Sequence, residues 1–247
     1  MSITGDTVLV AGATSGIGRG LAIKLHQAGN KVIVAGRREE LLADLVAEHP
    51  GMDAHPFDIT SGGSVSQLFK GVTEQHPDLN VVVAMAGVMI AENVLDPAAM
   101  DITERTIDTN LTGPIRLIHT FLPFLQDKAD ASIITVTSGL AYVPLKFTPT
   151  YCATKAAVHS YTESLREQLR DTAVNVIEIA PPLTRTNLMG PGTDNDRAMP
   201  LEEFLDETMS ILSQPDVQQV LVERVKRQRF AEATGTYDEV LAMQSGR

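Results

Sequence analysis

The sequence predicts an α/β fold, with a doubly wound parallel sheet that carries helices on both faces. Short runs of β-branched and apolar residues alternate with longer segments of helical period, which is typical of consecutive β-α-β units. Several of the short runs are apolar throughout, as expected of strands buried on both faces. The length of 247 residues suits one domain with a full core.

The predicted strands, in chain order, are residues 7–11, 31–35, 53–57, 80–84, 132–137 and 174–179. The helical segments between them are residues 16–28, 39–48, 64–76, 103–126 and 151–170. A further helix at 201–212 and a last strand at 217–222 follow, and then a charged helix or tail.

The segments give a domain organisation. Residues 184–200 are polar, with glycine and proline at 190–192, and predict a long, mobile, functional loop. We expect one dinucleotide-binding catalytic domain over residues 1–247, with a substrate loop around 184–200 and a C-terminal extension at 201–247.

Charge excludes some partners. Lysine and arginine total 20 against 31 acidic residues, so the net charge is −11. This charge repels nucleic acid and anionic membranes, and we expect neither as a partner.

Composition also bears on localisation and metals. No apolar stretch reaches the ~20 residues that cross a bilayer, and the first residues carry no targeting signal. A single cysteine, Cys152, suits a reducing cytoplasm. The six histidines include no pair with metal-ligand spacing beside carboxylates or thiols. We therefore expect a cytoplasmic protein without a metal.

A glycine-rich turn follows the first predicted strand and opens a helix. Glycines at such a turn let backbone N–H groups approach a pyrophosphate at the positive end of the helix. A tight strand–helix connection would explain the turn alone, but its place in the first β-α-β unit favours a dinucleotide. The candidate cofactor residues are Gly12, Thr14, Ser15, Gly16, Ile17 and Gly18.

The second strand ends in Gly36-Arg37-Arg38 instead of an acidic residue. An acid there would repel a 2′-phosphate, whereas arginine accommodates one. Arg37 and Arg38 therefore predict NADP(H) as the cofactor, although they could also solvate the next helix and pair with Glu39 and Glu40.

A third motif carries catalytic residue types. Tyr151 and Lys155 are four residues apart, so they share one face of a helix. Ser138 follows the fifth strand, and Asn110 lies in the helix before that strand. A tyrosine–lysine pair alone could be an ordinary surface pair, but chance explains the combination with the glycine turn poorly.

With these motifs the sequence resembles the compact branch of the short-chain dehydrogenase/reductase family, from about Val8 to Asn187. Residues 136–141, 151–157 and 179–182 are most similar to oxidoreductases named from the teichoic-acid D-alanylation gene cluster. The resemblance implies a Rossmann-like sheet and a catalytic set of Asn110, Ser138, Tyr151 and Lys155.

The resemblance also implies a role for each catalytic residue. Tyr151 would protonate the carbonyl oxygen in reduction and act as the base in the reverse direction. Lys155 would lower the pKa of Tyr151, which is about 10 in free tyrosine, and hold the nicotinamide ribose. Ser138 would donate a hydrogen bond to the carbonyl oxygen, and Asn110 would hold a water that connects Lys155 to solvent.

By the same resemblance, further residues contact the cofactor. Asp58 and Ile59 would contact the adenine, and Ala86 and Gly87 the adenosine ribose. The segment 181–186, through Pro181, Thr184 and Thr186, would contact the nicotinamide carboxamide. A purely structural role is the alternative for each, for example helix capping by Asp58.

The sequence departs from the family at paired positions. Ala11-Gly12 replaces the usual Thr-Gly, and Ala84-Met85-Ala86-Gly87 replaces Asn-Asn-Ala-Gly. In the family these polar groups tie the first strand to the fourth. Losing one partner would strand a buried polar group at a cost of ~1–3 kcal/mol, whereas losing both is nearly neutral. We interpret the change as a coordinated switch to apolar packing.

The resulting hypothesis is an NADP(H)-dependent oxidoreductase that interconverts a small-molecule carbonyl and a secondary alcohol, without a metal. Family members commonly form homodimers or homotetramers through the helices near Thr103 and Tyr151, and the same is expected here. A non-catalytic dinucleotide-binding redox sensor is the alternative, although it would not need the serine, tyrosine and lysine. A nucleotide-sugar epimerase or dehydratase would need a larger substrate domain after the sixth strand.

The expected substrate wall is apolar and combines Leu140, Val143, Pro182, Leu188 and Met189.

Overall fold

The computed structural model describes residues 4–190 and 196–246. Seven parallel strands form one sheet in the order β3-β2-β1-β4-β5-β6-β7, which confirms the predicted fold class. The strands are β1 (Thr7–Ala11), β2 (Lys31–Gly36), β3 (Asp53–Pro56), β4 (Val81–Ala84), β5 (Ala131–Val136), β6 (Val174–Ile179) and β7 (Gln219–Val220). The strand order reverses between β1 and β4, and open α/β sheets bind ligands outside the carboxyl ends of their strands at such a point.

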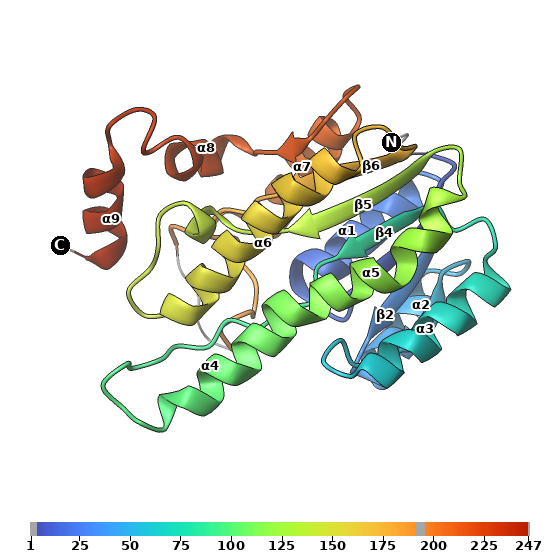
Figure 1. The fold of residues 1–247 in the computed structure, drawn as a ribbon, viewed down its shortest axis with the longest axis horizontal. Helices are drawn as coiled ribbons and strands as arrows, with labels where there is room; N and C mark the ends of the chain where they lie inside the picture. The colour runs from blue at the N-terminus through green and yellow to red at the C-terminus, as the bar shows by residue number, and fades with distance from the viewer. Residues whose placement is uncertain (1–3, 191–195, 247) are drawn as a thin grey trace.

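Helices cover both faces of the sheet (Figure 1). One face packs against α1 (Gly16–Gln27), α2 (Glu39–Glu48) and α7 (Leu201–Leu212). The other face packs against α3 (Gly62–Gln75), α5 (Gly113–Gln126) and α6 (Pro149–Gln168).

The two halves of the core follow from strand alternation. On β1, Val8 and Val10 lie in the core with α1, whereas Leu9 and Ala11 lie in the core with α5. All four side chains are fully buried, as the continuous apolar run of the sequence predicts.

The long helix predicted at 103–126 is three segments in the structure. These are α4 (Ala99–Ile107), a π-helical turn at Asp108–Thr112, and α5. Pro114 has no backbone N–H for the carbonyl four residues earlier, so regular pairing is interrupted here. Gly113 instead donates to the carbonyl of Asp108, five residues back. The turn contains Asn110, and π-helical turns are frequent at functional sites.

The C-terminal segment forms α8 (Glu223–Arg229) and α9 (Tyr237–Ser245). Figure 1 shows both helices beyond the sheet, at the end where the chain passes from β5 to α6. The last strand is shorter than predicted, with only Gln219 and Val220 paired to β6. Among the described helices, none is both long and apolar enough to cross a membrane.

The predicted substrate loop is closed at its base by a parallel bridge between Thr184 and Met199. Its residues 191–195, including Pro191 and Gly192, lie outside the described residues.

Candidate active site

The glycine-rich turn brings backbone from β1, α1 and β4 into close contact. Gly12 has a φ of +109°, and an added Cβ would lie 2.7 Å from the backbone of Ala86. A Cβ on Gly18 would lie 2.1 Å from the carbonyl oxygen of Gly12. Only glycine fits at position 12, where φ is positive and the backbone of Ala86 is close, and at position 18, where the carbonyl of Gly12 leaves no room for a Cβ. Ile17 packs against the core and anchors the first turn of α1.

The amino end of α1 suits an anion. Ser15 begins the helix without a side-chain capping bond, and the first turn contains no acidic residue. Uncapped N–H groups at a helix start carry a partial positive charge and bind phosphate. The residues present therefore fit a dinucleotide pyrophosphate.

Arg38 extends this positive site. Its guanidinium donates to the hydroxyl of Thr14 at 3.1 Å and to that of Ser15 at 2.7 Å. The Thr14 side chain also packs on Gly36, where a Cβ would lie 2.7 Å from the methyl carbon of Thr14. These contacts put an exposed cation on the outer side of the glycine turn.

Arg37 is associated with Asp58 instead. The pKa of Asp58 is lowered, first by a hydrogen bond from the Thr60 backbone and in part by the charge of Arg37. The Asp58 carboxylate accepts from the N–H of Thr60 at 3.0 Å and from its hydroxyl at 2.8 Å. The residue that caps α3 is Ser61. Asp58 instead holds Thr60 in the turn before that helix, which is a structural role.

Ile59 and Gly87 have different surroundings. Ile59 is buried, and its side chain lies where a Cβ on Gly113 would approach to 2.8 Å. Its carbonyl accepts from Arg116 at 2.8 Å. Gly87 faces two of the candidate catalytic residues, since its added Cβ would lie 3.3 Å from Asn110 Oδ1 and 3.8 Å from Lys155 Nζ.

The two departures from the family pattern meet in the sheet. Ala11 of β1 and Ala84 of β4 are direct partners in the parallel register, and both are buried. This pairing supports a joint replacement of two polar groups by apolar ones. Met85 donates its N–H to the carbonyl of Ala11 at 3.1 Å, so the backbone connection between the strands is kept.

The segment after β6 also reaches the glycine turn. Pro181 accepts from the N–H of Gly139 at 2.8 Å, and Thr184 donates its hydroxyl to Pro182 at 3.1 Å. The side chain of Thr186 lies 3.5 Å from a Cβ added to Gly16. Residues 181–186 therefore connect the Ser138 end of the site with the phosphate-binding turn.

Ser138 and Tyr151 are in contact. Burial raises the pKa of Tyr151 to about 12, and a hydrogen bond from Ser138 counteracts part of this effect. The Ser138 oxygen also accepts from the N–H of Leu140 at 3.1 Å. The raised pKa is opposite to the expected acidification of Tyr151, because burial disfavours the phenolate when no cofactor charge is present.

Lys155 is buried beside the tyrosine. Its Nζ lies 5.6 Å from the centre of the Tyr151 ring and donates to the carbonyl of Val136 at 2.7 Å. Burial lowers the pKa of Lys155 to about 8. Lys155 is therefore mostly protonated at neutral pH, while its contribution to acidifying Tyr151 is small in this state.

Asn110 is held firmly from the π-helical turn. Its side chain accepts from the N–H of Val88 at 2.8 Å and donates to the Val88 carbonyl at the same distance. A longer bond of 3.5 Å reaches the hydroxyl of Thr154. Asn110 thus ties the segment after β4 to the helix that carries Tyr151 and Lys155.

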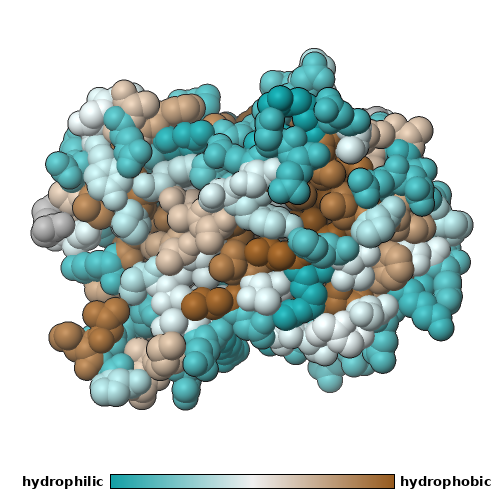
Figure 2. Space-filling view, viewed as in Figure 1, coloured by the Kyte–Doolittle hydropathy of each residue, from teal (hydrophilic) through white to brown (hydrophobic). Residues whose placement is uncertain are grey.

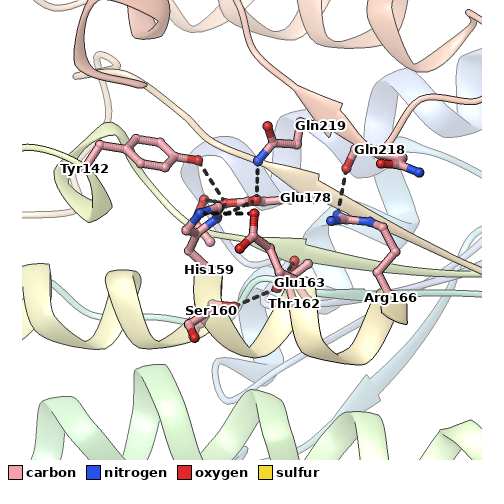
Figure 3. Close-up of polar contacts among 12 residues, drawn as sticks. Tyr142, His159, Ser160, Thr162, Glu163, Arg166, Glu178, Gln218 and Gln219 are labelled. Carbon is pink, nitrogen blue, oxygen red and sulfur yellow. Dashed lines mark hydrogen bonds and ion pairs between the residues drawn. The ribbon is translucent and has the colours of Figure 1, made fainter. Parts of the chain in front are cut away.

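A buried glutamate behind this site was missed by sequence reasoning. Glu178 of β6 is fully buried and bonds to Thr137, Tyr142, His159 and Gln219 at 2.6, 3.2, 2.9 and 2.7 Å (Figure 3). These donors counteract the effect of burial and lower the pKa of Glu178 to about 2, while Glu178 raises the pKa of His159. The network joins the strand end before Ser138 to α6.

The C-terminal helices close over residues 139–146. Gln228 of α8 occupies the space beside Gly139, where a Cβ would lie 2.2 Å from the Gln228 side chain. Gln244 of α9 donates to the carbonyl of Val143 at 2.9 Å. Val143 is fully buried against α9, so its predicted place in the substrate wall is wrong. Leu188 and Met189 are 46% and 41% exposed and remain available for that wall.

The fold and the residues of this site match those expected of a dinucleotide-binding α/β oxidoreductase, and the comparisons with known proteins show the family. The family model described as short chain dehydrogenase matches residues 6–197. The chain therefore belongs to the short-chain dehydrogenase family.

Individual relatives and solved structures are also short-chain dehydrogenases or oxidoreductases by their descriptions. The chain is 36% identical to the uncharacterised oxidoreductase DltE of Bacillus subtilis, over 94% of the chain and 93% of that protein. A short-chain dehydrogenase from Burkholderia cenocepacia, solved with NADP, shares the fold with a TM-score of 0.83 and 24% identity, over 99% of the chain and 98% of that structure. A serine dehydrogenase solved with NADP⁺ has a TM-score of 0.78 and 27% identity, over 85% of the chain and 90% of that structure.

Proposed function

We propose that the protein is an NADP(H)-dependent reductase or dehydrogenase that interconverts a carbonyl and a secondary alcohol, with Tyr151 as general acid and base. The observation that carries this proposal is the contact between the hydroxyls of Ser138 and Tyr151 beside the buried ammonium of Lys155. A proton donor, a second hydroxyl and a cation in one buried place suit a carbonyl oxygen that gains negative charge.

The nicotinamide would supply or accept the hydride. In reduction, Tyr151 gives its proton to the substrate oxygen while Ser138 donates a hydrogen bond to the same oxygen. The ammonium group of Lys155 would stabilise the phenolate that Tyr151 becomes. A proton from solvent would then return to Tyr151 and restore the site. A pKa of about 12 keeps Tyr151 protonated at neutral pH, so the free chain is ready for reduction.

The proposed cofactor is NADP(H). The glycine turn and the uncapped start of α1 would hold its pyrophosphate, and Arg37 and Arg38 its 2′-phosphate. Asp58, Ile59, Ala86 and Gly87 would line the adenosine side, and Pro181, Thr184 and Thr186 the nicotinamide side. The serine dehydrogenase with 27% identity was solved with NADP⁺, which supports a cofactor of this class.

The Tyr151→Phe variant tests the catalytic role. We expect the turnover of NADPH with a panel of ketones and aldehydes to fall by about 10²–10⁴-fold, because the proton donor is lost. NADPH binding, measured by fluorescence titration, should be unchanged. A variant that keeps its rate would refute Tyr151 as the acid, and wild-type protein that binds NADPH but reduces no carbonyl would favour a redox sensor.

A further inference from the structure

A group of three possible metal ligands lies outside the proposed active site. Asp53 and His55 are two residues apart on β3, so their side chains share one face of the strand. His76 directly follows α3. One ligand atom of each residue lies within 4.8 Å of the others.

The three side chains converge on one carboxylate oxygen. Nε2 of His76 lies 2.8 Å from Oδ2 of Asp53, and Nε2 of His55 lies 3.6 Å from the same oxygen. The second distance is too long for a hydrogen bond. Nε2 of His55 is nevertheless buried and has no hydrogen-bond partner among the described residues. A buried ring nitrogen without a partner is costly, and it needs an explanation.

We propose that Asp53, His55 and His76 bind a divalent transition-metal ion, with Zn²⁺ as the best match. This proposal departs from the metal-free expectation of the sequence, which rested on histidine spacing along the chain. Two imidazoles and a carboxylate are ligands that zinc accepts, and a water completes a tetrahedral site. Two atoms bound to tetrahedral zinc at about 2.1 Å lie about 3.4 Å apart. The observed 2.8 and 3.6 Å lie on either side of this value, so small side-chain movements suffice.

Three protein ligands and a water also occur at catalytic zinc sites. This site lies away from the proposed active site, so the ion would stabilise the fold and take no part in hydride transfer. Asp53 is the first residue of β3, and β3 is the edge strand of the sheet. His76 lies at the carboxyl end of α3, because that helix runs back from the cofactor side. The proposed ion would lie at the amino end of β3, whereas the glycine turn follows the carboxyl end of β1. There it would join a four-residue edge strand to the helix that covers it.

Binding is tested on the full chain, prepared without metal and without a histidine tag. Titration with ZnCl₂ by calorimetry, and with CoCl₂ by visible absorption, should give about one ion per chain and the spectrum of a tetrahedral site. Added Zn²⁺ should raise Tm, since it binds the folded state. Turnover with NADPH should be the same with and without the ion, and an ion-dependent rate would overturn the structural role.

Two variants remove ligands while keeping shape. His55→Phe keeps a ring against Gly71, where a Cβ would lie 3.6 Å from the His55 ring, and Asp53→Asn keeps the side-chain size. Each should weaken Zn²⁺ binding at least tenfold and abolish the Tm increase. If His55→Phe fails to fold by circular dichroism, Asp53→Asn decides.

A second histidine pair provides the control. The rings of His26 and His49 are also in edge contact, with centroids 6.3 Å apart, but no third ligand joins them in the described part of the chain. The double variant His26→Phe/His49→Phe should bind Zn²⁺ like the wild type. No binding by the wild type, or equal binding by Asp53→Asn, would overturn the proposed site.

Discussion

The two arginines after β2 have different environments, although they are neighbours in the sequence. Arg38 donates hydrogen bonds to the hydroxyls of Thr14 and Ser15, whereas the charge of Arg37 helps to lower the pKa of Asp58. Arg38 is therefore already held against the turn that would bind phosphate. This difference separates two cations that the sequence alone treats as equivalent.

We predict that Arg38→Ala weakens NADPH binding by more than tenfold and NADH binding by less than threefold, because only NADPH carries the 2′-phosphate. Arg37→Ala is the matched comparison. It should also weaken NADPH binding more than NADH binding, but by a smaller ratio than Arg38→Ala. Fluorescence titration with both cofactors measures the ratios. Equal losses for NADPH and NADH in both variants would refute 2′-phosphate recognition by these arginines.

Glu178 contributes to stability in a defined pH range. Its pKa is lowered to about 2, so its contribution is present above the unfolded value of about 4.5 and is lost as the pH falls towards 2. The pKa of His159 is raised above its unfolded value of about 6.5. Its contribution to the free energy of unfolding is therefore complete below about pH 6.5 and is lost as the pH rises through the folded pKa. The pair therefore stabilises the fold most between about pH 4.5 and 6.5.

We predict that Glu178→Gln lowers the free energy of unfolding by about 3 kcal/mol in that range, because it removes the charge that His159 and the other donors stabilise. Urea unfolding at several pH values measures the loss. Glu163→Gln is the control, since Glu163 is 55% exposed and lies 3.6 Å from the same histidine. A loss no larger than that of the control would contradict a stabilising role for Glu178.

Some residues of the site could be predicted from the sequence, and others could not. Tyr151, Lys155 and Ser138 were recognisable because a helical repeat and a strand end determine their positions. The partners of Glu178 lie directly after β5, on α6, on β7 and in the segment before α6, and no sequence spacing connects them. The same holds for His76, which joins Asp53 and His55 only because α3 returns to the edge of the sheet.

At the scale of elements, apolar patterning determines most boundaries. Strands β1 and β6 and helices α2 and α7 have the predicted bounds. The π-helical turn at Asp108–Thr112 was not predicted, because one wider turn hardly changes the hydrophobic period. The proline that causes it was visible in the sequence, but its effect depends on which carbonyl loses its donor.

The C-terminal helices form the element with the clearest functional consequence. Gln244 of α9 donates to the carbonyls of Val143 and Pro144 at 2.9 and 3.2 Å, and Lys146 donates to the carbonyl of Ser245 at 2.8 Å. These contacts hold the segment that runs from Ser138 towards Tyr151. Sequence patterns had identified this region only as a charged helix or tail.

We predict that Gln244→Ala raises the KM for the carbonyl substrate about 3–10-fold, because the loss of ~1 kcal/mol of hydrogen bonding loosens residues 139–146. The dissociation constant for NADPH should not change, since α9 does not contact the glycine turn. Steady-state kinetics and cofactor titration measure the two quantities. Asp238→Ala on the exposed side of α9 is the control, and a matching KM change in it would remove the specific role of Gln244.

Across the whole molecule, apolar side chains gather in patches on one face. Figure 2 shows apolar side chains over α5 and α6 and at the end where the chain enters α4. Val94 and Leu95, before α4, are 75% and 87% exposed. A groove of about 520 Å³ lies nearby and is lined by residues of α4 and α6 that include Ile107, Ala153 and Ala157. Tyr151 and Lys155 do not line it, so it is distinct from the proposed substrate site.

We predict that a second copy covers this surface, which gives a homodimer or homotetramer. Ala153→Arg introduces a charge into the groove and should shift the protein to a monomer in light scattering. Ala47→Arg is the control, because Ala47 is exposed on α2, which covers the other face of the sheet. A monomeric wild type, or an unchanged mass for Ala153→Arg, would contradict this assembly.

The pairing of Ala11 with Ala84 constrains how this chain can change over time. An asparagine at position 84 alone would bury its amide opposite the methyl group of Ala11. A threonine at position 11 alone would bury its hydroxyl opposite the methyl group of Ala84, and either buried polar group would lack a partner. Each single step towards the polar arrangement is therefore disfavoured, whereas exchanging both positions together would give each polar group a partner. The two positions should be inherited together, and a lineage with only one of them exchanged should be rare.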